Sequence, residues 1–224
     1  MPAEYPADMA AVAAEIDRQH IPGLSWGTNP TAADLAALKN LKTLRTLNLW
    51  GVQISHAELV PLQELTGLHT LVISGPKITD AGLANLKTLV ELRSLHLQRA
   101  GVTGTGLLEL KDLKNLELLD LGATPLTNEG LASVTQLQNL RTLILRETKV
   151  TDAGLVHLKK LKALQSLNLG FTAVTDAGLV NLKELKNLRS LWLSHSVSPQ
   201  GVAELQKALP DCHIDLWEPR IDER

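Results

Sequence analysis

The sequence predicts an α/β solenoid: a right-handed coil of short repeats, each adding one strand to a parallel β-sheet on the concave face and one short helix to the convex face. Three observations lead to this fold class. A leucine pattern recurs every 24 residues, and each copy changes halfway from strand-like to helix-like periodicity. Hydrophobic residues make up 44% of the chain but aromatic residues only 3%. Leucine must therefore fill a core built from one repeated packing unit.

The first half of each repeat predicts a strand. It reads L-x-x-L-x-x-L-x-L, as at residues 41–49, and apolar residues alternate with polar ones around Leu47 and Leu49. Such alternation is typical of a short strand with one buried face. The copies begin, without a shift in register, at Leu41, Leu65, Leu89, Leu113, Leu137, Leu161 and Leu185.

The second half of each repeat predicts a short helix. It reads T-D-A-G-L-x-x-L-x-x-L at residues 79–89, and residues 151–161 follow the same pattern. We expect the threonine to cap the helix and the aspartate to favour the positive end of the helix dipole. Leu83, Leu86 and Leu89 form one apolar face. A unit of this size cannot bury that face alone, so stability must come from stacked neighbours.

These motifs resemble the leucine-rich-repeat family. The T-D-x-G-L variant is similar to the 24-residue subtype of many bacterial proteins, including the GALA-type and cysteine-containing repeats. The resemblance covers about residues 28–218. It implies the horseshoe-shaped leucine-rich-repeat solenoid as the fold, and protein binding as the function.

The ends of the chain depart from the repeat, as the caps of a solenoid should. Residues 1–27 are expected to hold a capping helix, over residues 6–20, and a degenerate first strand. The 24-residue repeats then occupy residues 28–197. Residues 198–224 are expected to form a C-terminal cap and a polar tail.

Charge and cysteine content argue against several classes of function. The net charge is −2, from 22 basic and 24 acidic residues, which gives no reason to expect nucleic acid or a membrane as partner. The single cysteine, Cys212, cannot form an intrachain disulfide. A secretory signal and an apolar run of about 18 residues are both missing. We expect a cytoplasmic protein without metal or cofactor, with secretion as an effector as the alternative.

Two features resemble ligand sites but have simpler interpretations. The glycines of residues 101–106 look like a phosphate-binding loop, yet Gly106 belongs to a glycine column that recurs in each helix. Lysines flanking the helices could form a basic ridge for nucleic acid. However, Glu64, Asp112 and Glu184 interrupt them and no aromatic residues interleave. A solvated convex face is the favoured interpretation.

Two columns of polar residues are expected to make contacts within the sheet. His96 and Asp120 occupy the same column of adjacent strands. An ion pair or ligand contact is favoured over a catalytic dyad, because the repeat places no Ser or Cys nucleophile beside them and an open sheet excludes water poorly. Thr124, Thr148, Thr172 and Ser196 form a second column, whose hydroxyls should bond to neighbouring backbone.

The candidate binding surface is the concave face, where residues between the inward leucines point. Its columns vary from repeat to repeat, and solvent-facing Trp, Arg and His are typical of binding hot spots. Trp50 and Trp192 lie six strands apart, roughly 29 Å at about 4.8 Å per strand, which favours a protein or extended peptide over a small molecule. The predicted contact residues are Trp50, His96, Arg99, Asp120, Ile144, Arg146, Glu147, Phe171, Trp192 and His195.

The sequence therefore predicts a non-enzymatic protein–protein interaction module that binds its partner on the concave face. The alternative is a bacterial effector or adaptor that redirects a host protein. We expect no catalytic residues, because an enzyme needs a deep pocket that an open arc seldom offers. We expect neither a nucleic-acid nor a membrane partner, and a monomer or weak homodimer. The contact centre is predicted in the C-terminal half.

Overall fold

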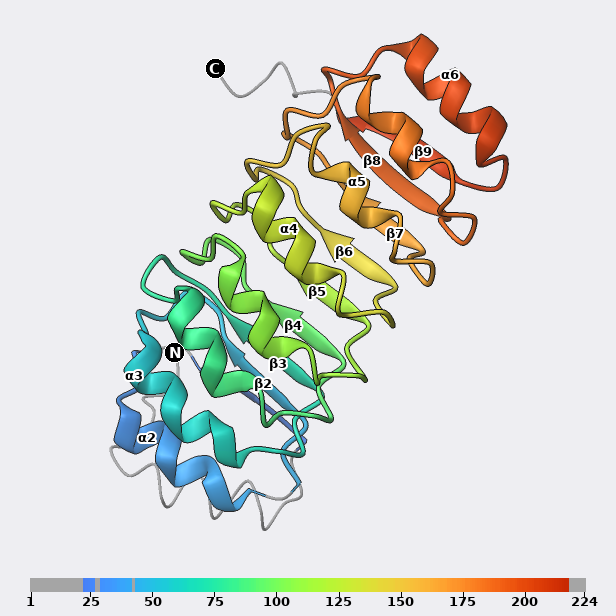
Figure 1. Cartoon of the computed structure of the whole chain (residues 1–224). Helices are drawn as coiled ribbons and strands as arrows, with labels where there is room; N and C mark the ends of the chain where they lie inside the picture. Colours follow the sequence, from blue (N-terminus) through green and yellow to red (C-terminus); the bar gives the residue numbers. More distant parts are fainter. Residues whose placement is uncertain (1–21, 27–28, 42, 218–224) are drawn as a thin grey trace, which may run out of the picture.

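A computed structural model describes residues 22–26, 29–41 and 43–217, and it shows a continuous solenoid (Figure 1). Within these residues nine parallel strands form one sheet, in the order β1 to β9 along the chain. The helical segments lie along one side of that sheet (Figure 1). The predicted α/β repeat solenoid is confirmed.

The strands are short and evenly spaced, as the 24-residue repeat requires. Leu47 pairs with Leu71, and Leu71 with Leu95, so the inward leucines of neighbouring strands lie side by side. A slip of one residue would turn these leucines to solvent, which fixes the register. The strands are β1 Gly23–Ser25, β2 Thr46–Leu49, β3 Thr70–Ile73, β4 Ser94–His96, β5 Leu118–Asp120, β6 Thr142–Ile144, β7 Ser166–Asn168, β8 Ser190–Ser194 and β9 His213–Trp217.

Half of the helical segments in the described chain are 3-10 helices. The α-helices are α2 Ala32–Ala37, α3 His56–Leu59, α4 Asn128–Val134, α5 Leu155–Leu158 and α6 Pro199–Ala208. The 3-10 helices are η1 Leu38–Asn40, η2 Val60–Glu64, η3 Asp80–Leu86, η4 Thr105–Leu110 and η5 Gly178–Leu182. The reason lies in the repeat itself: leucines at intervals of three residues match the three-residue turn of a 3-10 helix, which stacks them on one face.

The core is a continuous column of leucines closed at both ends. In the central repeats the motif leucines have no exposed surface, as at Leu95 and Leu97. Trp26 closes the N-terminal end. Cys212 is buried at the other end, where burial raises the pKa of its thiol to about 11 and keeps it protonated. The capping helix expected over residues 6–20 lies outside the described residues.

The threonine–aspartate pair joins each repeat to the next. Asp152 accepts hydrogen bonds from the backbone N–H (2.8 Å) and the hydroxyl (2.6 Å) of Thr175 in the following repeat. The same contact recurs between Asp80 and Thr103 and between Asp176 and Ser198. Between Asn128 and Thr151, Oδ1 of the asparagine accepts the backbone N–H, but its Nδ2 donates to the threonine hydroxyl. We call this contact the repeat clamp. It ties neighbouring turns together outside the nine-stranded sheet.

Helix capping by the motif threonine, which the sequence predicted, occurs only in part. Thr127 does cap α4, since its hydroxyl accepts the N–H of Gly130 at 3.1 Å. Thr79 makes no capping hydrogen bond to η3, so the expectation is wrong there. Asp80, which follows Thr79, was expected to interact with the dipole of its own helix. Its carboxylate instead accepts hydrogen bonds from Thr103 in the next repeat.

The recurrent glycine lies where the clamp of the preceding repeat approaches the helix. Asp80 Oδ1 accepts the N–H of Gly104 (3.0 Å) and of Gly106 (2.8 Å). A Cβ atom at Gly106 would lie 2.3 Å from the backbone carbonyl oxygen of Asp80. At Gly82 the preceding repeat has His56 instead of aspartate, and a Cβ would meet only side-chain atoms, at 3.3 Å. The glycine is therefore required by the neighbouring repeat.

Asparagines form a second set of bonds between repeats. They lie just before a buried leucine, and each donates its side-chain amide to a backbone carbonyl of the preceding repeat. The bonds are Asn115 to Val90 (3.0 Å), Asn139 to Lys114 (2.7 Å) and Asn187 to Lys162 (2.8 Å). In the repeat between those of Asn139 and Asn187, this position is occupied by Ala163.

Ala163→Asn is expected to raise the free energy of unfolding by about 1 kcal/mol, because the new amide can donate to the carbonyl of Gln138. Urea unfolding followed by circular dichroism measures the change. Asn139→Ala, which removes an existing bond of this type, should lower the free energy of unfolding by a similar amount. If Asn139→Ala lowered the free energy of unfolding but Ala163→Asn did not raise it, the idea that the same bond can form in every repeat would be contradicted.

Candidate interaction surface

The face of the sheet opposite the helices carries the outward strand residues. Leu47 and Leu49 are fully buried in β2, and Asn48 between them is partly exposed. The same alternation leaves Ile144 of β6 and Trp192 of β8 partly exposed. The inward and outward positions of these residues are as the sequence predicted, although Asp120, in the same outward column, is buried. We call this surface the sheet face.

The exposed aromatic residues of the sheet face fall into two places. Phe171 follows β7 and exposes 40% of its surface, and Trp192 lies in the adjacent strand β8. Trp50, which exposes 46%, follows β2 near the other end of the sheet. The structure therefore brings Phe171 and Trp192 to neighbouring strands and leaves Trp50 separate.

Six of the predicted contact residues gather at the C-terminal end of the sheet face. They are Ile144, Arg146, Glu147, Phe171, Trp192 and His195, and we call them the C-terminal patch. Ile144, Asn168 and Trp192 stand in register on β6, β7 and β8. Arg146 Nη2 lies 2.9 Å from Glu147 Oε1, with both side chains partly exposed. A pair at this exposure contributes only about 0.2–1 kcal/mol to folding, so it is available to a partner.

One column of the sheet face has left-handed backbone. Its members follow the strands, and their φ angles are positive: Arg99 (58°), Ala123 (57°), Glu147 (57°) and Phe171 (55°). Gly51 and Gly75 hold the same column in the first repeats, at 79° and 110°. A residue other than glycine costs roughly 1–2 kcal/mol in this conformation. Gly51 and Gly75 are the sequence signal for this conformation, because glycine adopts positive φ without strain.

Asp120 supports the sheet face from below. It is 1% exposed. Its Oδ1 accepts the N–H of Gly122 (2.9 Å), while Oδ2 accepts from Gln98 (2.5 Å) and lies 3.5 Å from Nδ1 of His96. The predicted contact between His96 and Asp120 is confirmed, but Asp120 is too buried to meet a partner directly. Asn48 and Asn168, in the same column, make the corresponding bond to the residue two positions on, at 2.9 Å.

The pKa of Asp120 reflects these contacts. Burial raises the pKa, but hydrogen bonds from His96, Gly122 and Gln98, together with the charge of His96, outweigh it. The pKa of the carboxyl therefore lies below its usual range, and Asp120 is ionised at neutral pH.

Ser94 lies on the other side of His96, with its Oγ 3.0 Å from Nε2. The expectation that no nucleophile stands beside His96 is wrong. Serine, histidine and aspartate are in the order that acyl transfer uses, but the backbone N–H groups of Ser94 and Leu97 donate to the carbonyls of His69 and Asp120. They cannot stabilise an oxyanion. Ser94 and Asp120 therefore fix the orientation of His96.

The remaining sequence features have structural roles. The N–H groups of Gly104 and Gly106 donate to Asp80, which explains the resemblance to a phosphate loop. The hydroxyls of the predicted threonine column each donate to the carbonyl three residues earlier, at 2.7 Å, in the order Thr124, Thr148 and Thr172. In the described part of the chain no three His, Cys, Asp or Glu side chains are grouped to hold a metal.

A search for membrane-crossing segments covered the same part of the chain. No helix there combines the length and the apolar composition that crossing a bilayer requires.

Comparison with known proteins identifies the repeat. The Leucine Rich repeat family model matches residues 136–159 and 160–183, two consecutive units of 24 residues. Internalin C2 from Listeria monocytogenes is 25% identical, with a TM-score of 0.65 and an alignment that covers 84% of each chain. Another internalin of that organism, InlF, is 21% identical with a TM-score of 0.65. That alignment covers 92% of this chain but 56% of InlF. Among curated proteins no significant match was found.

The open parallel sheet, the short helices and these matches define the class: the fold is a leucine-rich-repeat solenoid.

Proposed function

We propose that this chain is a protein-interaction module that binds a partner protein, or an extended segment of one, on the sheet face, with the contact centre at the C-terminal patch. One observation carries the proposal. Phe171 adopts a left-handed backbone conformation (φ 55°) and still exposes 40% of its surface. The isolated chain therefore bears both the strain and the exposed ring. A partner that covers the ring removes the cost of its exposure, while the left-handed backbone is shared with Arg99, Ala123 and Glu147.

The neighbours of Phe171 fit the same role. Glu147 is strained in the same way and carries the ion pair with Arg146. Trp192 adds a second ring on the adjacent strand. Aromatic and arginine side chains side by side are the usual composition of a binding hot spot. His96, held by Ser94 and Asp120, offers an oriented polar contact further along the face.

Phe171→Gly separates binding from folding. Glycine relieves the left-handed strain, so the free energy of unfolding should stay level or rise by up to about 1 kcal/mol. Capture of the partner from a lysate of the source cell, read by mass spectrometry, should fall at least about tenfold, a loss of about 1.4 kcal/mol in binding. Trp192→Ala should weaken capture in the same way.

Val90→Ala is the matched control, because Val90 exposes 45% of its surface but lies in a connection outside the sheet face. It should capture the partner like the wild type. Equal capture by wild type and Phe171→Gly would exclude the C-terminal patch as the contact centre. The identity of the captured protein would also show whether the module acts in its own cell or on a host.

A further inference from the structure

The helical side of the solenoid carries exposed apolar side chains that the core does not need. Val156 in α5 exposes 46% of its surface and Val180 in η5 exposes 56%. They hold the same position in adjacent repeats, and α5 packs against η5. That position is apolar in every repeat: Ala36, Val60, Ala84, Leu108, Ala132, Val156 and Val180. The members of this column are exposed or partly exposed, so the column is an apolar stripe on the surface of the helical side.

Lysines flank the two valines at the ends of the same helical segments. Lys159 caps α5 and Lys183 caps η5. Lys160 follows and is exposed, as is Lys186 in the connection to β8. Residues 159–163 and 183–187 together hold five lysines but only one acidic residue, Glu184, which pairs with Lys162 at 3.1 Å. This excess of positive charge occurs in a chain whose net charge is −2.

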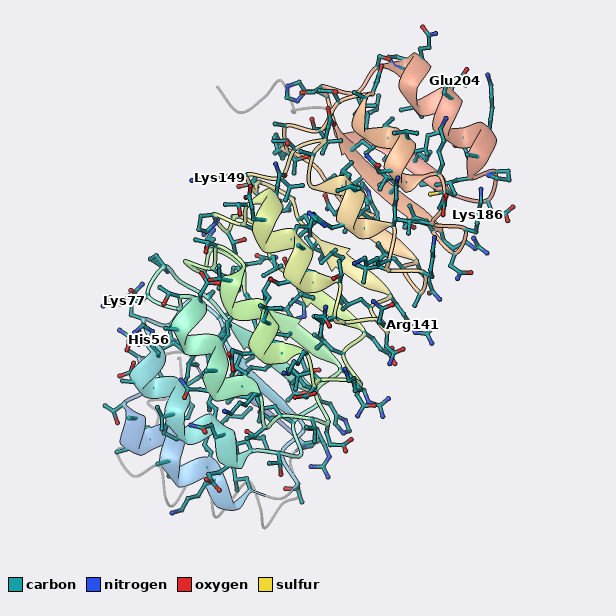
Figure 2. The ribbon with its side chains drawn as sticks, in the orientation of Figure 1. His56, Lys77, Arg141, Lys149, Lys186 and Glu204 are labelled. Carbon is teal, nitrogen blue, oxygen red and sulfur yellow. The ribbon has the colours of Figure 1, made fainter. Side chains whose placement is uncertain are left out.

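Basic side chains lie on both edges of the solenoid. Figure 2 shows Lys186 and Arg141 on one edge, and Lys77 and Lys149 on the opposite one. At the second edge the aspartates of the repeat clamp lie near the lysines in sequence, as Asp80 does near Lys77. The lysine cluster at the ends of α5 and η5 is therefore a local feature, and it adjoins the exposed valines.

We propose that Val156, Val180, Lys159, Lys160, Lys183 and Lys186, which we call the α5–η5 surface, bind an acidic amphipathic segment of a second protein. The apolar side chains of that segment cover the valines, and its carboxylates meet the lysines. Nucleic acid fits less well, because this surface has no aromatic side chain on which a base can stack. A phosphate backbone would also leave the valines uncovered. The surface faces away from the sheet face, so the chain can hold two partners together.

A designed peptide tests this inference. The probe is a labelled peptide of about 16 residues, some 24 Å long as a helix, with leucines along one face and glutamates elsewhere. Fluorescence anisotropy with the full chain measures its binding. Lys159→Glu/Lys183→Glu and Val156→Ser/Val180→Ser should each weaken binding at least about tenfold. Peptides with glutamine for glutamate, or alanine for leucine, should bind more weakly than the probe by a similar factor.

The chain offers matched controls. Lys77→Glu/Lys149→Glu makes the same change of charge on the opposite edge and should alter binding less than about twofold. Phe171→Gly should leave peptide binding unchanged, which separates this surface from the sheet face. The variants change exposed or partly exposed side chains, and urea unfolding checks that each variant is folded. The proposal would be overturned if the wild type did not bind the peptide, or if both lysine pairs caused equal losses of binding. It would also be overturned if poly(U) RNA displaced the peptide equally well from the wild type and from Val156→Ser/Val180→Ser.

Discussion

Gly106→Ala is expected to lower the free energy of unfolding by about 3 kcal/mol, because the methyl group overlaps backbone atoms that cannot move aside independently. A Cβ there would lie 2.3 Å from the carbonyl oxygen of Asp80 and 2.7 Å from its carbonyl carbon. Relief requires the repeat containing Asp80 to separate from the next one. That movement would weaken the hydrogen bonds from Gly106 and Gly104 to the Asp80 carboxylate.

Gly82→Ala is the matched control, because Gly82 holds the same place in the preceding repeat. There the Cβ would meet His56 Cβ and Leu59 Cδ1 at 3.3 Å, and small side-chain shifts relieve both contacts. Alanine is also favoured over glycine inside a helix by about 1 kcal/mol. The two effects oppose each other, so Gly82→Ala should change stability by less than about 1 kcal/mol. Urea unfolding measures the stability of both variants. Equal losses in the free energy of unfolding would contradict the role given to the repeat clamp.

The repeat fold could be predicted because the leucine spacing is a local signal repeated seven times. Leucines at residues 89–97 fix both the inward face of β4 and its register with the neighbouring strands. The repeat clamp could not be predicted with the same ease. A threonine followed by aspartate fits a helix cap equally well, and its actual partner, such as Thr175 for Asp152, lies 23 residues away.

The candidate site was predictable as columns but not as contacts. Alternation along the strands places Ile144 and Trp192 on the sheet face, and burial confirms it. The depth of Asp120 and the contact from Ser94 to His96 depend on side-chain rotamers, which a sequence pattern does not define. The apolar column through Val156 and Val180 is readable in the sequence, but its exposure is not, because an apolar position on a helix is equally compatible with burial.

Asp120→Asn is expected to destabilise the chain at neutral pH and to reduce its sensitivity to acid. The pKa of Asp120 is lowered in the fold by contacts with His96, Gly122 and Gln98 that outweigh its burial. The pKa of Asp80 is lowered in the same way by the hydrogen bonds that it accepts from Thr103, Gly106 and Gly104, which outweigh its burial. An unfolded aspartate titrates near pH 3.9. Both groups therefore add stability above about pH 4, which is lost as the pH falls through their lower folded pKa values.

Replacing the carboxylate by an amide removes the charge-assisted part of its bonds, a cost of about 1.5–3 kcal/mol at pH 7. Below about pH 4 the wild type begins to lose that advantage, so the difference in stability between the two proteins should narrow as the pH falls. Urea unfolding at pH 7, 5, 4 and 3 measures this, with Asp112→Asn as an exposed control that should follow the wild type. Parallel curves for wild type and Asp120→Asn would contradict the assignment. Convergence would show that the ionised Asp120 stabilises the centre of the sheet face, where it also contacts His96.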